Sequence, residues 1–427
     1  MHKDLESLVA ADKRHVLHPQ TVVGQPADPF IVDRAKGSMI WDAEGKSYID
    51  GTCGLWQCAV GHGRPELASV AAEQMQRLEY YASFWDFSNE PAIRLAERLT
   101  ELAPEGLNKV FFTSGGSEGT ETALKLARLA RHATGEPERT IVLARKAGYH
   151  GVSGTALAAT GIDRMKAGYG PLDDGFVHLT QPSPLELGEN ATDQLIAELE
   201  ETIERVGPER ITAFVGEPVL GVSGMVPPPE GYWPRVQEVL RRHGILLILD
   251  EIVTAYGRTG HWFAAERFGV NPDMIITAKG LSSGYVPMGA VLIGDRVVEM
   301  LDGTGFWHGF TYNGHPVGAA VSLANLDIIE REGLLDRAKV QGQRLLDALA
   351  PLAELDGVRE VRGCGLMVGI EFTDDIAADV VAGCREDGVI ARGAATKLVL
   401  SPPLVITDDE VDTLCEVLSR HVTALAG

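Results

Sequence analysis

The sequence predicts an α/β fold in which helices wrap a mostly parallel sheet. Between residues 109 and 294, short apolar runs alternate with amphipathic helical patterns, which is the arrangement of βα units. Two runs, Ile245–Leu249 and Met274–Thr277, are apolar without polar alternation, as in strands buried on both faces. Asp250 ends the first run and Lys279 follows the second. Because open parallel sheets bind ligands at the carboxyl ends of their strands, this acid and this amine indicate a site.

The other elements follow in order along the chain. The patterns before residue 109 predict a small antiparallel meander at Phe30–Asp50 and helices at Leu5–His15, Pro65–Leu78 and Asn89–Leu102. Ser88 is the predicted N-cap of the last helix. The alternating part adds strands at Val110–Thr113, Thr140–Ala144, Ile211–Val215 and Gly289–Gly294 and helices at Glu118–Ala133, Asp193–Val206 and Trp233–His243.

The last third of the chain indicates a second, smaller domain. Long helical patterns at Val317–Arg331 and Leu334–Leu352 precede a tail in which strands and helices alternate. We expect this α+β domain to combine both ends of the chain. The division predicted is residues 1–60 as the N-terminal segment of the small domain, 61–318 as the large domain and 319–427 as the C-terminal part of the small domain.

The composition disfavours several classes of function. A net charge of −22 on 427 residues would repel nucleic acid and anionic membranes. No apolar run approaches the roughly 20 residues that span a bilayer. The five cysteines form no CxxC pair, the histidines lack metal-ligand spacing, and the N-terminus lacks the apolar core of a secretory signal. We expect a cytoplasmic protein without a metal site.

A Gly-rich stretch, FFTSGGSEGTETALKL at Phe111–Leu126, leads from a predicted strand into a predicted helix. Glycines let backbone N–H groups approach an anion, and a helix N-terminus adds partial positive charge, so Gly115, Gly116 and Ser117 are candidates to hold a phosphate. The stretch lacks the GxxxxGK[ST] pattern of a P-loop. The alternative is an ordinary strand–helix turn capped by Ser117.

Asp250 and Lys279 gain meaning together with that loop. Singly, each fits a strand-end cap or a surface lysine. A lysine amine forms a Schiff base with an aldehyde, and an aspartate keeps a pyridine nitrogen protonated. Phosphate loop, pyridine partner and amine are the parts needed to bind pyridoxal 5′-phosphate (PLP). Tyr149, in the sequence Tyr-His-Gly, supplies a ring that can stack on the pyridine, or it is a turn aromatic.

Arg392 and the stretch Gly280–Gly284 each allow two interpretations. Arg392 is a candidate carboxylate clamp, because a guanidinium matches a carboxylate bidentately, or it is a solvated arginine. Gly280–Gly284 fits the GxSxG pattern of hydrolases, whose serine must lie on a turn from strand into helix. Here a strand-like run follows, so we do not expect a hydrolase.

The sequence as a whole resembles the class III aminotransferases, which are PLP-dependent enzymes of fold type I. The resemblance covers nearly the whole chain, and its blocks are FFTSGGSEGTETALKLAR, GYHG, GEPV with VPPPEGYW, LILDEIVTAYGRTG, PDMIITAKGLSSGYVPMGAV, HGFTYNGHPVGAA, VRGCGLMVG and SPPLVIT. The chain is most similar to the ω-transaminase branch, which includes amine–pyruvate and β-alanine–pyruvate enzymes. The resemblance implies a large PLP-binding domain with a mostly parallel seven-stranded sheet, plus a smaller α+β domain.

The resemblance also assigns the site residues. For the cofactor it implies Lys279 as the Schiff-base lysine and Asp250 as the partner of the pyridine nitrogen. The remaining cofactor contacts would be Tyr149 and Ile252 on the two ring faces, Gly116 and Ser117 at the phosphate, and Thr311 at the phosphate of the neighbouring subunit. Trp56, Phe84 and Trp85 would lie at the substrate pocket, and Arg392 would be a mobile arginine that grips a carboxylate.

The implied function is an ω-aminotransferase that moves an amino group from a primary amine or ω-amino acid to an oxo acid, with pyruvate as the expected acceptor. The reaction would be ping-pong through pyridoxamine phosphate, in a homodimer or a pair of dimers with shared sites. The alternatives are a class III enzyme that uses GABA, a diamine or taurine with 2-oxoglutarate, a PLP decarboxylase or aminomutase, and a noncatalytic binding protein. The loop Leu220–Gly224 departs from the family pattern, as does Ser114–Ser117.

Overall fold

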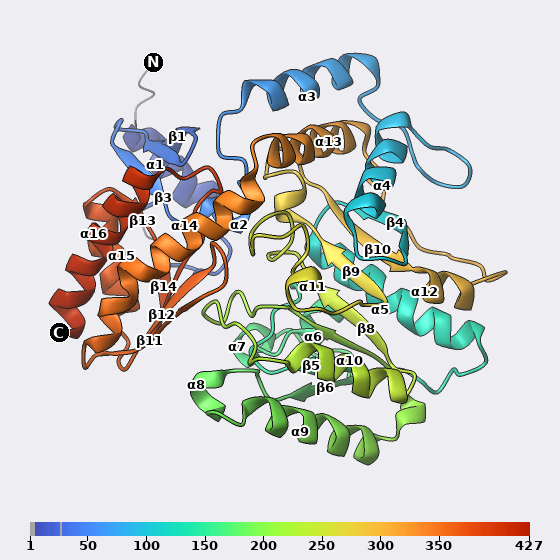
Figure 1. The fold of residues 1–427 in the computed structure, drawn as a ribbon. Coiled ribbons are helices and arrows are strands. Elements are labelled where there is room, and N and C mark those ends of the chain that lie inside the picture. Colours follow the sequence, from blue (N-terminus) through green and yellow to red (C-terminus); the bar gives the residue numbers. More distant parts are fainter. Residues whose placement is uncertain (1–4, 26–27) are drawn as a thin grey trace.

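The computed structural model describes residues 5–25 and 28–427, and a seven-stranded sheet lies at its centre (Figure 1). The strand order is β4-β10-β9-β8-β7-β5-β6. Only β10 runs opposite to its neighbours, so the sheet is mostly parallel, as predicted. The strands are Leu107–Thr113 (β4), Ile141–Arg145 (β5), Phe176–Leu179 (β6), Ile211–Gly216 (β7), Leu246–Asp250 (β8), Met274–Thr277 (β9) and Gly289–Gly294 (β10).

Helices cover both faces of this sheet, and the alternation of side chains along the strands shows why. In β8, Leu246 and Ile248 pack into one hydrophobic cluster, while Leu247 and Leu249 pack into another. The first cluster includes side chains of α5, and the second includes those of α9 and α10. A strand buried on both faces has no polar alternation. The helices of this part are Pro65–Arg77 (α3), Glu90–Leu102 (α4), Gly116–Ala133 (α5), Gly154–Ala159 (α6), Asp163–Lys166 (α7), Pro184–Leu187 (α8), Ala191–Val206 (α9), Tyr232–Arg242 (α10), Ala264–Arg267 (α11) and Asp295–Met300 (α12).

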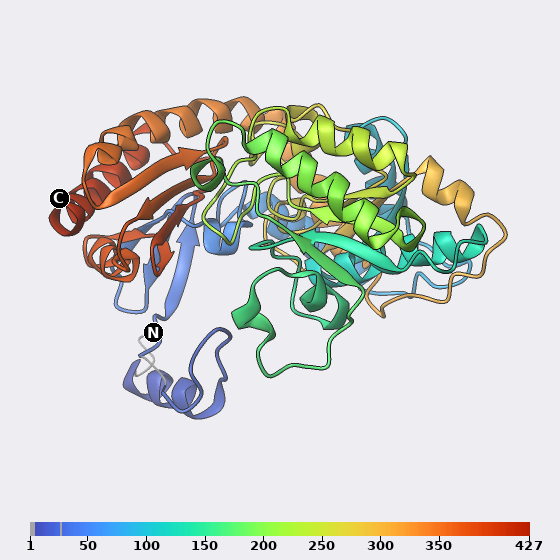
Figure 2. The same ribbon diagram turned by 90° about the horizontal axis from the view of Figure 1, so that it is seen from below.

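The two ends of the chain meet in a smaller α+β part, where blue and red segments lie together in Figure 2. One sheet has the order β1-β2-β3-β13, with β13 parallel to β3, and the other has the order β11-β12-β15-β14. Its strands are Val32–Lys36 (β1), Met39–Asp42 (β2), Ser47–Asp50 (β3), Val358–Gly363 (β11), Val368–Phe372 (β12), Val389–Ile390 (β13), Arg392–Ala394 (β14) and Lys397–Leu400 (β15). The N-terminal and C-terminal helices are Leu5–His15 (α1), Cys53–Trp56 (α2), Pro316–Arg331 (α13), Leu334–Leu349 (α14), Ala377–Glu386 (α15) and Asp408–Ala426 (α16).

The exact division between the two parts remains a proposal. Helix α13 packs against α3 and α4 of the larger part, and α14 packs against α16 of the smaller part. The boundary proposed at residues 318 and 319 falls inside α13. The proposed N-terminal segment, residues 1–60, includes residues 1–4 and 26–27, which lie outside the described part of the chain.

Some local predictions were wrong. Asn89, not Ser88, is the N-cap of α4, because the Asn89 side chain accepts the N–H of Ala92 at 3.0 Å. Helix α5 begins at Gly116, so Ser117 lies in its first turn and is not its cap. Strand β6 was not predicted. It is short, it lies at the sheet edge, and most of its side chains are only half-buried, so it lacks the continuous apolar run of the inner strands.

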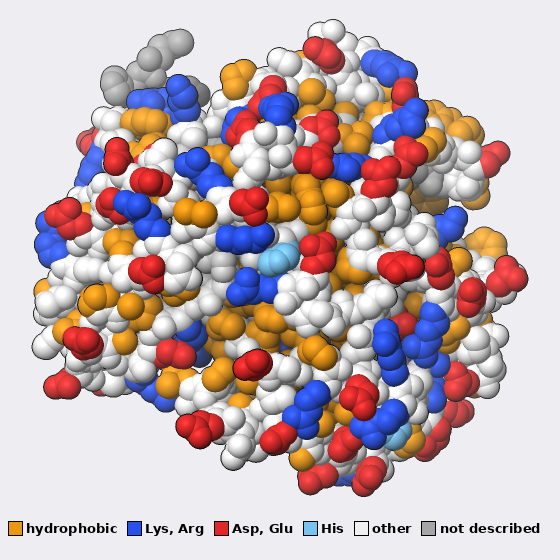
Figure 3. All heavy atoms as spheres, viewed as in Figure 1, with side chains coloured by type: hydrophobic (Ala, Val, Ile, Leu, Met, Phe, Trp, Pro, Cys, Tyr) orange, Lys and Arg blue, Asp and Glu red, His pale blue; other side chains and the backbone are white. Residues whose placement is uncertain are grey.

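The face of the molecule shown in Figure 3 carries no large area of one charge sign. Acidic and basic side chains are interspersed on it, with hydrophobic patches between them. Among the helices of residues 5–25 and 28–427, none combines the length and the apolar character needed to cross a bilayer.

Candidate active site

A cavity of about 410 Å³ lies where the parallel strands end. Asp250 is the last residue of β8, and Lys279 lies two residues past the end of β9. Both residues line the cavity, as open parallel sheets predict. The other lining residues come from the loops after β4, β5, β7, β8 and β9 and from the segment after α2, namely Gln57, Ser114, Gly115, Gly116, Ser117, Tyr149, His150, Gly151, Glu217, Val222, Ile252, Val253, Ala278, Ser282, Gly284, Val286, Pro287 and Met288.

Asp250 is buried and held on both of its oxygens. His150 Nδ1 lies 2.7 Å from Asp250 Oδ2 and donates to it, since a carboxylate can only accept. The backbone N–H of Ile252 donates to Oδ1 at 3.2 Å. The other ring nitrogen of His150 is buried without a protein partner in the described residues. Carboxylate oxygens carry more than one lone pair, so Asp250 can accept a further hydrogen bond from a ligand in the cavity.

Lys279 is a buried amine whose environment favours its neutral form. Burial lowers its pKa to about 8, and the negative charges of Asp250 and Glu217 offset part of that shift. Its backbone has φ of 41°, in the left-handed region that a non-glycine residue rarely adopts. Such strain is held in place by the surrounding structure and clusters at functional sites. The amine is therefore a nucleophile near neutral pH.

Glu217 is a cavity residue that the sequence reasoning did not single out. It accepts the N–H of Tyr149 at 2.9 Å and the N–H of Gly221 at 2.9 Å, so it fixes the backbone that carries Tyr149. Burial raises the pKa of Glu217, and the nearby charge of Asp250 adds to that shift. The sequence held a signal for it, because Glu217 follows β7 as Asp250 ends β8, and both fit the rule of ionisable residues at strand ends.

The Gly-rich loop forms one wall of the cavity. A Cβ added at Gly116 would lie 2.6 Å from the Cδ1 of Ile252, so only glycine allows the loop to approach that side chain. The first turn of α5 directs its free N–H groups toward the cavity end of the helix, which favours an anion. Ser117 Oγ is already hydrogen-bonded, as it accepts the N–H of Val152 at 3.3 Å. The loop therefore fits a phosphate in its chemistry.

These observations agree with comparisons to known proteins. The model of the aminotransferase class-III family matches residues 22–422. The chain belongs to the class III aminotransferase family. The putrescine–pyruvate aminotransferase of Pseudomonas aeruginosa is 39% identical, in an alignment that covers 93% of this chain and 91% of that protein.

Two more relatives show how close the similarity is. The diaminobutyrate–2-oxoglutarate transaminase of Halomonas elongata is 38% identical and covers 99% of this chain and 96% of its own length. A solved structure of a thermostable (S)-enantioselective ω-transaminase from Thermomicrobium roseum is 44% identical, covers 99% of both chains and has a TM-score of 0.96. The resemblance, fold type I and PLP dependence are thereby confirmed.

The residues of this aminotransferase fit the cofactor. A buried lysine of lowered pKa, a buried carboxylate with a free lone pair and a glycine-lined helix N-terminus match the aldehyde, the pyridine nitrogen and the phosphate of PLP. Tyr149 and Ile252 line the same cavity. The GxSxG alternative does not hold, because residues 279–281 form a single 3-10 turn and Ser282 donates its hydroxyl to the carbonyl of Val286 at 2.6 Å.

A second cavity, of about 330 Å³, adjoins the first. Trp56 and Arg392 line it, and Val222 lines both cavities. Lys279 Nζ lies 5.3 Å from the centroid of the Trp56 ring, and Arg392 Cζ lies 5.0 Å from the same centroid. Arg392 is exposed and forms no ion pair with the described residues. The structure thus brings these two predicted substrate residues to the cavity mouth.

Three other predicted residues do not reach either cavity within one chain. Trp85 is 88% exposed, and Phe84 lies against Gly309. Thr311 is exposed, and its carbonyl accepts the hydroxyl of Tyr80 at 2.7 Å. The sites predicted for Phe84, Trp85 and Thr311 therefore cannot form from the contacts of a single chain.

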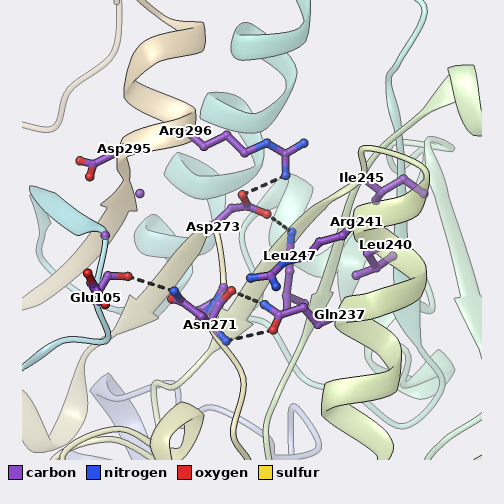
Figure 4. Close-up of a pocket in the computed structure, with 13 residues that line it drawn as sticks. Glu105, Gln237, Leu240, Arg241, Ile245, Leu247, Asn271, Asp273, Asp295 and Arg296 are labelled. Carbon is purple, nitrogen blue, oxygen red and sulfur yellow. Dashed lines mark hydrogen bonds and ion pairs between the residues drawn. The ribbon is translucent and has the colours of Figure 1, made fainter.

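A further pocket, of about 240 Å³, lies at the opposite edge of the sheet (Figure 4). It is lined by the start of β8, the residues before β9 and the end of β10. Its polar side chains form hydrogen bonds and ion pairs within the pocket. Asp273 pairs with Arg296 at 3.1 Å and accepts the N–H of Leu247 at 2.8 Å. These contacts tie strand ends together, and the pocket contains no buried amine or nucleophile.

Proposed function

We propose that this aminotransferase takes the amino group from a primary amine or an ω-amino acid and passes it to an oxo acid, with pyruvate as the acceptor. The observation that carries this proposal is the place of the Trp56 ring near both Lys279 and Arg392. An apolar ring beside the reactive amine favours a hydrocarbon substituent. An exposed guanidinium on the same ring offers a charge that binds a carboxylate and can leave when none is present.

The cavity residues hold the cofactor in this proposal. Lys279 would bond to it through its amine, Asp250 would accept a hydrogen bond from its pyridine nitrogen, and Gly116 and Ser117 would contact its phosphate. Tyr149 and Ile252 would contact its two faces. When bound, PLP supplies an aldehyde that takes up the amino group and a ring that withdraws electrons from the carbon that loses a proton.

Lys279 moves the proton in the chemical step. A pKa of about 8 lies close to physiological pH, so the neutral amine can accept the proton from the amine-bearing carbon of the donor. Its protonated form would then deliver this proton to the cofactor carbon that keeps the nitrogen. His150 and the N–H of Ile252 donate to the two oxygens of Asp250 and so fix the orientation of the carboxylate that would meet the pyridine nitrogen. The buried, water-poor setting strengthens that interaction.

A second copy of the chain completes the site. We propose a homodimer in the cytoplasm in which Thr311 reaches the phosphate of the neighbouring subunit, while Phe84 and Trp85 border its substrate pocket. Large exposed apolar side chains near these residues support this, since Trp85 is 88% exposed and Trp307 is 93% exposed. Apolar surface of this kind marks an interaction site.

The test separates the two half-reactions of Arg392→Ala. We expect the reaction with a carboxylate-free amine to stay within about twofold, and the reaction with pyruvate to slow by about 10- to 100-fold, since a hydrogen bond to a charged group contributes about 1.5–3 kcal/mol. Stopped-flow absorbance of the bound cofactor measures both. Arg164→Ala, at an exposed arginine of the same second cavity, is the matched control. Equal losses in both half-reactions would contradict the role of Arg392, and faster turnover with 2-oxoglutarate would contradict pyruvate as the acceptor.

A further inference from the structure

A group of polar and sulfur-containing side chains lies on both sides of Trp56 in the sequence and has no part in the proposed reaction. Cys53 begins α2, and Cys58 follows it by five residues. Cys53 is buried and Cys58 is half-buried. Asp50 and His62 flank them along the chain and are in contact with each other.

The fold of this segment brings the two thiols together. The N–H of Cys58 donates to the carbonyl of Cys53 at 3.2 Å, which closes a tight turn. A Cβ at Gly54 would lie 3.3 Å from Cys58 Sγ, so the glycine leaves room for that sulfur against the backbone. The two thiols are close enough to affect each other's pKa: Cys53 lowers that of Cys58, while burial and Cys58 raise that of Cys53. Disulfides form only between cysteines that the backbone already holds this close.

His62 and Asp50 supply charge to Cys58. His62 Nε2 lies 2.9 Å from Asp50 Oδ2. Burial alone would lower the pKa of His62, but its bond to Asp50 and the proximity of Cys58 raise that pKa to about 10, so the ring is a cation. The pKa of the Cys58 thiol is lowered by the proximity of Cys53 and by His62. A thiolate beside a histidine cation is the reactive form of cysteine.

Asp50 fixes this arrangement. Its two oxygens also accept the N–H groups of Thr52 at 3.0 Å and Gly54 at 2.7 Å, so the same carboxylate orients both the loop and His62. On the other side, Arg258 Nη2 lies 3.3 Å from Cys53 Sγ and donates to it. Burial raises the pKa of the Cys53 thiol, and the charge of the buried Arg258 offsets part of that shift.

We propose that Cys58 and Cys53 are a redox-active pair in which a peroxide oxidises Cys58 first and Cys53 then closes a disulfide. The Cys58 thiolate attacks one peroxide oxygen and breaks the O–O bond, which gives a sulfenic acid and, after protonation, one water. The Cys53 sulfur attacks the Cys58 sulfur, and the hydroxyl leaves with the Cys53 proton as a second water. Two thiols lose two electrons, and hydrogen peroxide gains them.

The pair is placed to affect the active site. Trp56 and Gln57 lie between the two cysteines in sequence, and Gln57 lines the cavity of Lys279. Val60, two residues after Cys58, connects the segment to the loop after Lys279, because its N–H donates to Ser283 Oγ at 3.2 Å. A bond between the sulfurs that flank Trp56 changes the backbone that positions its ring. This consequence rests on the proposed role of Trp56, whereas the oxidation itself does not.

The other cysteines serve as internal controls. Cys364, Cys384 and Cys415 are buried, and burial raises the pKa of each thiol. Buried thiols in apolar surroundings are inert. These three cysteines are in the same molecule as Cys58, so a difference between their reactivity and that of Cys58 does not depend on sample preparation.

The test uses holoenzyme treated with hydrogen peroxide and analysed by peptide mass spectrometry. We expect iodoacetamide to alkylate Cys58 at least ~10-fold faster than Cys364 at neutral pH. Peroxide should produce a Cys53–Cys58 linked peptide with the loss of two hydrogen atoms, and dithiothreitol should reverse it. In Cys53→Ser, dimedone should trap Cys58 as the sulfenic acid. Cys415→Ser should behave as wild type.

Two results would overturn the proposal. One is alkylation of Cys58 at the rate of the three buried thiols. The other is peroxide oxidation without the Cys53–Cys58 link in the wild type, a measurement that needs no variant to fold. Turnover should fall as the link forms and recover with dithiothreitol, but only while both cysteines are present. Full turnover with the link formed would refute the coupling to Trp56, and a link formed in a catalytically inactive chain would leave the redox pair established without the proposed function.

Discussion

The floor of the cavity, formed by Asp250 and Lys279, is buried within one chain, whereas the segment around Thr311 is exposed. On the floor, Asp250 and Lys279 are buried, and every neighbour that sets their chemistry comes from the same chain. The segment around Thr311 is hydrogen-bonded to residues 80–89 but exposes its large aromatic side chains. The part of the site that would face the aldehyde and the pyridine ring is therefore built within one chain. In our proposal the phosphate and the substrate also need contacts from a second chain.

The largest effect is expected on the floor. Asp250→Asn keeps the shape of the side chain but removes the charge opposite the pyridine nitrogen. We predict a loss of about 10²- to 10³-fold in turnover, the range for removal of one preorganised electrostatic group. Steady-state kinetics measures it, with the exposed Asp302→Asn as the control. Turnover near the wild-type level would mean that Asp250 does not face the cofactor.

Mixed dimers sharpen the comparison. We predict that Lys279→Ala and Thr311→Glu are each inactive, because the first lacks the amine and the second places a negative charge beside the phosphate. Co-expressed together, they should regain about one quarter of wild-type activity, since half of the symmetric dimers are mixed and each contains one intact site.

If Thr311 served its own chain instead, no mixed dimer would contain an intact site and no activity would return. Thr373→Glu, at an exposed threonine after β12, is the control for adding the charge. Normal activity of Thr311→Glu alone would place Thr311 away from the phosphate.

The pKa of Lys279 gives a smaller effect that needs no substrate. Burial lowers this pKa from 10.5 to about 8, and the neutral amine is the reactive form. The rate at which an aldehyde and cyanoborohydride modify Lys279 in the apoenzyme should therefore rise with pH to a midpoint of about 8. Asp250→Asn removes an anion that raises this pKa, so its midpoint should be lower. A midpoint near 10.5 would show that the amine is solvated.

The smallest effect concerns the anchoring of the exposed segment. Asn89 caps α4 and also donates to the carbonyl of Gly314 at 2.8 Å, so it links the start of α4 to the chain just after Thr311. Asn89→Ala should lower the free energy of unfolding of the apoenzyme by about 1–2 kcal/mol. Ser88→Ala, at the exposed neighbouring residue, should change it by less than ~0.5 kcal/mol. Urea denaturation compares them, and equal effects would return the cap to Ser88.

The sequence predicted those parts of the site that follow from strand burial. Asp250 and Lys279 stood out because each follows an apolar run with no polar alternation. His150 was missed because its role is to support Asp250, a contact between loops 100 residues apart that no local pattern encodes. Glu217 obeyed the same strand-end rule and could have been found by applying it to β7.

The errors in the fold have similar causes. Ser88 and Asn89 are both good N-cap residues, and the choice between them depends on which one has extended backbone before Pro91. Strand β6 is defined by its pairing with β5 rather than by its own hydrophobicity. Phe84, Trp85 and Thr311 line neither cavity within the single chain, and in our proposal a second chain brings them to one.

The most direct test of the central claim is borohydride reduction of the holoenzyme followed by peptide mapping. The account predicts that reduction fixes the cofactor to one residue, Lys279, and that Lys279→Ala holds no reducible cofactor. A cofactor fixed to another lysine, or a Lys279→Ala variant that still forms a reducible link, would contradict it.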